Sequence, residues 1–213
     1  MHRLNRGDAP ACLGRYQHGR NTWRDLTAED RAEIWQALEA MQGQRCAYCE
    51  SQLTADKRHI EHFVPRSRYP QHTFDWGNLF GSCDRQDSCG HHKDRKGKPY
   101  DDADLLKPDV DDPDHYLIFV SDGTIKVRQH LNDHERRRAS ETLRVFNLDA
   151  EAGALRHMRQ SAVAGYLQIA EELWSLKGEL PEQEWQELLQ AELDAMTHLP
   201  FVTAIRHTLC ALS

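Results

Sequence analysis

Residues able to bind metals and move protons are concentrated in positions 44–97. The stretch "CAYC" supplies Cys46 and Cys49, and "SCDRQDSCG" supplies Cys83 and Cys89. Structural zinc is held tetrahedrally by four such ligands, usually two from each of two tight turns. We therefore predict a structural Zn²⁺ on these cysteines, with the five residues of the wider pair looping out. A disulfide oxidoreductase is the alternative, but no thioredoxin-like strand–helix pattern surrounds Cys46.

The stretch "HIEHFVP" places an acid and two imidazoles in a short apolar strand between the cysteine pairs. A neutral imidazole suits a general base near pH 7, and a carboxylate with an imidazole suits Mg²⁺ or Mn²⁺. Hydrolysis of a phosphodiester needs both. Glu61 and His62 point to opposite faces of a regular strand, so both reach one phosphate only where the strand twists or ends, as Pro65 allows. We interpret His59 as a structural bystander.

The segments "IEHFVPRS", "DWGNLFGSC" and "CGHHKDRKG" resemble the motif of the HNH endonucleases. This resemblance implies a ββα-metal fold, often stapled by a four-cysteine zinc, in which Glu61 binds the catalytic divalent metal and His62 is the general base. It further implies that Asn78 orients this base or its loop. His92 would complete the metal site, with His91 as the alternative.

The chain departs from the HNH pattern beside the metal site. Most members have Asp or His where Glu61 stands, so one extra methylene must be accommodated. The final histidine usually follows its cysteine directly, whereas here Gly90 intervenes, and the last cysteine pair is C-x5-C instead of C-x2-C. The basic residues after this histidine are expected to contact phosphate oxygens and so position nucleic acid: Lys93, Arg95, Lys96 and Lys98.

Longer segments resemble one subgroup of this family. "CAYCE", "DWGNLFGSCD", "KPDVDDPDHYLIFVSDGTI" and "ETLRVFNLD" look, in that order, like the HNH subunit of Septu-type antiphage systems, which also occurs beside some retrons. The resemblance implies a DNA or RNA substrate and an ABC/SMC-like ATPase partner. In the retron form it also implies a reverse transcriptase with its nucleic acid. The alternative function is a zinc-stapled nucleic-acid-binding or scaffold module that no longer catalyses.

The charge distribution separates the cysteine-rich segment from the C-terminal end. The 213 residues carry a net charge of −7, but residues 45–98 carry ten Lys/Arg against seven Asp/Glu, whereas 171–213 carry two against eight. The acidic end could therefore dock a basic partner. No apolar run approaches the ~20 residues that cross a bilayer. The first residues lack the apolar segment of a secretory signal, so we expect a cytoplasmic protein with reduced thiols.

The element pattern predicts an α+β fold built around a zinc-stapled ββα-metal core. Thr27 is a plausible N-cap for a helix that ends at Gly43. Apolar residues spaced by three and four predict one helix over 155–176, and further helices follow Pro181 and Pro200. The expected segments are an N-terminal irregular stretch and helix, the nuclease core, an acidic loop with a β-hairpin, and a C-terminal helical region: 1–43, 44–100, 101–134 and 135–213.

Overall fold

Helix α1 (Ala28–Gln42) begins and ends at its capping residues in the computed structural model, which describes residues 1–95 and 99–210. The Thr27 side chain accepts a hydrogen bond from the backbone N–H of Asp30, whose carboxylate accepts one from Thr27 N–H. Gly43 ends the helix with a φ of 64°, a conformation that glycine adopts without strain. The predicted helix is confirmed, and its buried Ile34 and Leu38 face the cysteine-rich segment.

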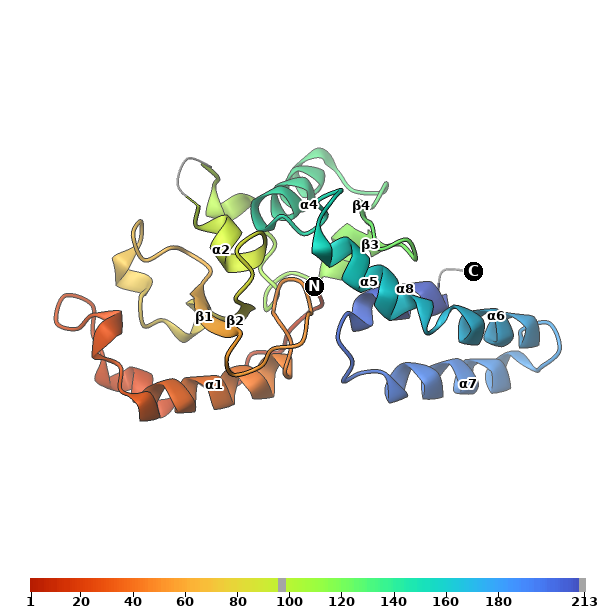
Figure 1. Cartoon of the computed structure of the whole chain (residues 1–213), viewed down its shortest axis with the longest axis horizontal. Helices are drawn as coiled ribbons and strands as arrows, with labels where there is room; N and C mark the ends of the chain where they lie inside the picture. The colour runs from red at the N-terminus through yellow and green to blue at the C-terminus, as the bar shows by residue number, and fades with distance from the viewer. Residues whose placement is uncertain (96–98, 211–213) are drawn as a thin grey trace.

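A two-stranded antiparallel sheet lies above α1 (Figure 1). Strand β1 (Arg58–His62) pairs with β2 (Leu79–Cys83), so that His59 lies opposite Ser82 and Glu61 opposite Phe80. The short helix α2 (Cys89–Lys93) follows and packs against β2 and against α4 (Asp133–Phe146). Both cysteine pairs and the "HIEH" strand are therefore brought to the same part of the fold.

A second hairpin follows the acidic loop, as predicted. Strands β3 (Leu117–Phe119) and β4 (Ile125–Val127) pair antiparallel around a turn in which Gly123 has a φ of +85°. The residues before this hairpin form the short helix α3 (Pro113–Tyr116). The Asp112 side chain caps this helix by accepting from Asp114 N–H.

The C-terminal region is helical, as expected, but the long helix predicted over 155–176 is wrong. Two helices, α5 (Ala154–Ala164) and α6 (Leu167–Leu176), replace it, because the chain turns at Gly165 and Tyr166. Both pack on α8 (Val202–Cys210), so the apolar spacing continues across the break. Helix α7 (Glu182–Ala195) runs beside α6 as a hairpin at the far end of the molecule (Figure 1). None of the described helices is long and apolar enough to cross a membrane.

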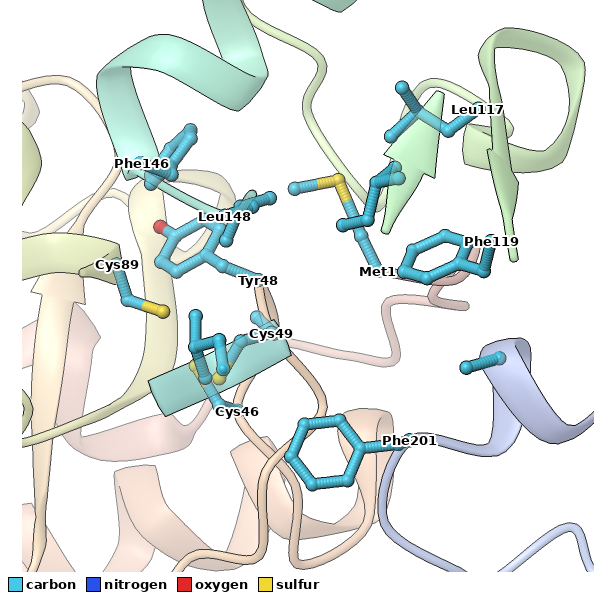
Figure 2. Close-up of a cluster of buried hydrophobic side chains, with 14 of the residues drawn as sticks. Met1, Cys46, Tyr48, Cys49, Cys89, Leu117, Phe119, Phe146, Leu148 and Phe201 are labelled. Atoms are coloured by element: carbon cyan, nitrogen blue, oxygen red, sulfur yellow. The ribbon is translucent and has the colours of Figure 1, made fainter. Parts of the chain in front are cut away.

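One apolar core joins the cysteine turns to the hairpin and the C-terminal helices (Figure 2). The Tyr48 ring, between Cys46 and Cys49, stacks on Phe146 of α4 with centroids 4.2 Å apart. Phe119 and Phe201 line the other side of the cluster (Figure 2). The core therefore holds the first cysteine pair in place from several elements.

Glu50 provides a polar connection across the same core. Its buried carboxylate accepts hydrogen bonds from the backbone N–H of Thr203, at 3.0 Å, and from the Thr203 hydroxyl, at 2.6 Å. These bonds satisfy groups in the first turn of α8, which would otherwise lack partners. The first cysteine turn and α8 are thus fastened together.

Candidate active site and zinc-binding cluster

The four predicted zinc ligands converge. Cys46, Cys49, Cys83 and Cys89 are buried, and their Sγ atoms all lie within 4.8 Å of one another. The Cys49 and Cys83 sulfurs are 3.8 Å apart. Tetrahedral zinc with Zn–S bonds of about 2.3 Å places its sulfurs about 3.8 Å apart. The cluster therefore has the ligands and the spacing to hold a zinc ion.

The local backbone explains how these thiols meet. Cys46 N–H donates to the Ser51 carbonyl, and Ala47 N–H donates to the Gly81 carbonyl in β2. Cys89 has a φ of 56°, a conformation that non-glycine residues adopt only when their surroundings enforce it. Although burial opposes ionisation, hydrogen bonds from the other three thiols hold the pKa of Cys46 well below its ordinary value. In the same cluster, hydrogen bonding with Cys46 raises the pKa of Cys83, and burial raises that of Cys89.

His62, the predicted base, is held in one tautomer. Its Nε2 lies 3.0 Å from the Thr73 carbonyl oxygen. Because a carbonyl only accepts, Nε2 carries the proton and Nδ1 keeps a lone pair. The ring also meets the Trp23 ring edge-on, with centroids 4.4 Å apart. Burial, aided by the charge of Arg66, lowers the pKa of His62 to about 4, so the imidazole is neutral at pH 7.

Asn78 fastens the backbone on both sides of this histidine. Its Oδ1 accepts from Val64 N–H at 2.7 Å, and its Nδ2 donates to the carbonyls of Val64 and His72. Val64 lies just after β1, and His72 precedes Thr73, whose carbonyl holds His62. Asn78 thus holds the strand end and the loop together.

Glu61 points to the other face of β1. Its Oε1 is 2.8 Å from the Lys93 ammonium, and its Oε2 is 3.2 Å from Nε2 of His59. Although burial opposes ionisation, the charge of Lys93 lowers the pKa of Glu61. A Cβ added to Gly90 would lie 2.6 Å from Cδ of Glu61. The glycine before the histidines therefore makes room for the extra methylene of this glutamate.

The predicted phosphate contact of Lys93 does not fit the structure. Its side chain is buried, because the ammonium neutralises Glu61 and donates to the His62 carbonyl at 3.1 Å. A lysine held this way does not extend from the surface to a phosphate. Arg95 is exposed and donates to the Gln86 carbonyl. Lys96 and Lys98 lie outside the described residues.

The two histidines of α2 have different surroundings. His92 is buried, and its Nδ1 donates to the Val145 carbonyl of α4 at 2.8 Å. His91 instead lies against His59, with ring centroids 4.2 Å apart. His59 in turn contacts Glu61, the predicted metal ligand.

His59 and Asp84, neither of which was predicted as a site residue, also lie beside His91. His59 lies two positions before Glu61. Because side chains two positions apart lie on the same face of a strand, the sequence spacing already indicates that His59 and Glu61 are neighbours. Asp84 directly follows Cys83, and its Oδ1 is 2.8 Å from Nε2 of His91.

Comparison with known proteins finds similarity to two proteins of antiphage systems, one of which is named as a putative HNH endonuclease. The Septu protein PtuB of Bacillus thuringiensis is 30% identical over 103 residues, which are 47% of this chain and 36% of the relative. The retron Vc95 putative HNH endonuclease of Vibrio cholerae serotype O1 biovar El Tor is 24% identical over 139 residues, 60% of this chain and 65% of the relative.

The similarity is partial. The chain spans about a third of the first relative and just under two thirds of the second. No protein-family model matches the chain.

Proposed function

We propose that this protein is a metal-dependent HNH endonuclease that hydrolyses phosphodiester bonds of DNA or RNA, with β1, β2 and α2 as its ββα-metal core. The observation that carries the proposal is the state of His62. It is neutral, its Nε2–H is occupied by the Thr73 carbonyl, and its Nδ1 retains the lone pair that takes a proton from water. Asn78 supports this role by holding the strand end and the loop.

Glu61 would hold the catalytic divalent ion, Mg²⁺ or Mn²⁺, through its carboxylate, of which one oxygen now pairs with Lys93 and the other with His59. When bound, the ion stabilises negative charge on the phosphate. Of the histidines on α2, His91 is better placed than the predicted His92, because it adjoins His59 beside Glu61.

Arg66 is our candidate for the phosphate contact that buried Lys93 does not make. It is exposed, four residues beyond the end of β1. Its charge acts on His62 and is attracted by Glu61. A guanidinium near both groups suits a phosphate that spans the strand end, where the base lies on one face of β1 and the acid on the other.

The names of the relatives support a role in antiphage defence. We propose that the chain is a cytoplasmic effector subunit that works with an ABC/SMC-like ATPase. In a retron system a reverse transcriptase and its nucleic acid would join it. Residues 44–100 would form the nuclease unit, and the acidic C-terminal helices would dock the partner.

The test compares wild type with His62→Ala, with and without the ATPase partner, in Mg²⁺ and in Mn²⁺. Supercoiled plasmid and single-stranded RNA are the substrates. Removal of a general base is expected to slow cleavage by about 10²–10⁴-fold. His115→Ala, a change of an exposed histidine paired with Glu135, should cleave like wild type. Equal cleavage by wild type and His62→Ala would favour the inactive nucleic-acid-binding or scaffold module.

A further inference from the structure

A cluster of metal-ligating side chains lies next to Glu61. His59 of β1, Asp84 just after β2 and His91 of α2 each offer one ligand atom, and these atoms all lie within 4.8 Å of one another. Three separate elements thus contribute one ligand each, as metal sites commonly require.

The backbone holds these elements in register. His59 lies opposite Ser82 in the β1–β2 pairing, and the Ser82 hydroxyl accepts from Gly90 N–H at 3.3 Å. Asp84 N–H donates to the Lys57 carbonyl at 3.1 Å. These bonds tie the start of α2 and the end of β2 to the strand that carries His59, so the cluster does not depend on flexible loops.

The donor atoms are available to an ion. Among the described residues, Nδ1 of His59 is buried without a hydrogen-bond partner, while Nε2 faces Oε2 of Glu61 at 3.2 Å. Burial of an unsatisfied ring nitrogen is costly and calls for an explanation such as a bound ion. The cluster is also open to solvent, since the side chains of Asp84 and His91 are 54% and 35% exposed.

We propose that His59, Asp84 and His91 hold a divalent transition metal ion such as Mn²⁺ beside Glu61, whose Oε2 lies 3.2 Å from Nε2 of His59. The inference rests on the proposed nuclease function and names the residues that hold its metal. Ligands at about 2.1 Å from one ion lie at most about 4.2 Å apart, so small side-chain rotations close the site around it.

The donor set determines the choice of ion. Two imidazoles with one carboxylate suit borderline divalent ions, whereas Mg²⁺ prefers oxygen ligands and gives up its water reluctantly. Mn²⁺ accepts both kinds of donor. The site therefore selects Mn²⁺ over Mg²⁺, and His59 is a ligand and not a bystander.

The test measures Mn²⁺ binding by electron paramagnetic resonance on the full chain, without nucleic acid. Wild type is expected to bind one Mn²⁺ in addition to the zinc of the four cysteines, and equimolar Mg²⁺ should not displace it. His59→Ala, Asp84→Ala and His91→Ala should each weaken binding at least about tenfold. His115→Ala is the matched control. Zinc content and circular dichroism verify that each variant is folded. If His59→Ala does not fold, His59→Gln takes its place in the test.

Two outcomes would overturn the proposal: wild type that binds no Mn²⁺, or folded His59 and His91 variants that bind it like wild type. His62→Ala separates the site from the proposed function, because it should keep Mn²⁺ affinity and lose cleavage. Mn²⁺ binding that depends on His59 and His91, in a protein that never cleaves, would support the site and refute the nuclease. If only His62→Ala loses cleavage and the cluster variants bind Mn²⁺ normally, the nuclease function is supported and the proposed metal site is refuted.

Discussion

Replacing Gly90 with alanine would place a Cβ where the Glu61 carboxylate now lies. The added atom would be 2.6 Å from Cδ of Glu61, whereas ordinary contacts begin near 3.4 Å. The carboxylate must therefore retreat by about 1 Å. That movement breaks its contacts with His59 at 3.2 Å and Lys93 at 2.8 Å. A displacement of this size at a catalytic site costs about 10²-fold in rate.

Shortening the acid should relieve the clash. In a double-mutant cycle, Glu61→Asp withdraws the carboxylate by one methylene, so Gly90→Ala should cost much less in that background. We expect a coupling of at least about 1 kcal/mol in both cleavage rate and unfolding free energy. Alone, Gly90→Ala should destabilise the fold by about 1–3 kcal/mol through overpacking.

Plasmid nicking in Mn²⁺ and urea denaturation provide the two readouts. Gly14→Ala is the matched control, because nothing lies within 4 Å of a Cβ there. In open space a helical Gly→Ala change stabilises by about 1 kcal/mol. Gly90→Ala with raised stability and unchanged cleavage would therefore refute the steric explanation of this glycine.

Three further predictions concern the supports of the site. Cys46→Ser should lose the single structural zinc and lower the melting temperature by about 10 °C, and full zinc content by metal analysis would contradict this. Asn78→Ala leaves both backbone groups of Val64 without their side-chain partner, so urea denaturation should show a loss of about 2–4 kcal/mol, and an unchanged midpoint would argue against the clamp. Burial raises the pKa of Asp114, but hydrogen bonds and charges, led by the hydrogen bond with His207, together lower it more. The pKa of Asp114 is therefore about 2, below its usual 3.8. Because this pKa is lowered by folding, the stabilisation is present above pH 4 and lost as the pH falls toward 2. Asp114→Asn should thus be about 1–2 kcal/mol less stable than wild type at pH 7, and this difference in unfolding free energy should shrink in acid. A difference that does not change with pH would exclude this linkage.

Features governed by neighbouring residues were predictable from the chain. The caps of α1 at Thr27 and Gly43 are local hydrogen bonds and a local φ value, and the second hairpin follows from a local turn around Gly123. The pairing of four cysteines was predictable for a different reason. Only a few chemistries use two close pairs of thiols in one small segment, and the convergence of their sulfurs agrees with that expectation.

The motif also indicated which residue types stand at the strand end, but not their contacts. Glu61 and His62 lie on opposite faces of β1, as the strand period requires. The tautomer of His62 depends on the Thr73 carbonyl, eleven residues away, and the role of Asn78 depends on bonds to two loops. Such bonds are made only when the loops fold back on the strand.

The remaining features arise from packing between elements distant in sequence. Lys93 reads as one of a run of surface cations, yet it is buried because Glu61 needs a counter-charge. His92 is held by α4, and His91 by β1 and the end of β2. Residue types and spacing therefore determine which chemistry is available to this chain. The side chains that share a site are determined by the docking of α2 between the β1–β2 sheet and α4, since burial and charge pairing act between surfaces that meet only in the folded protein.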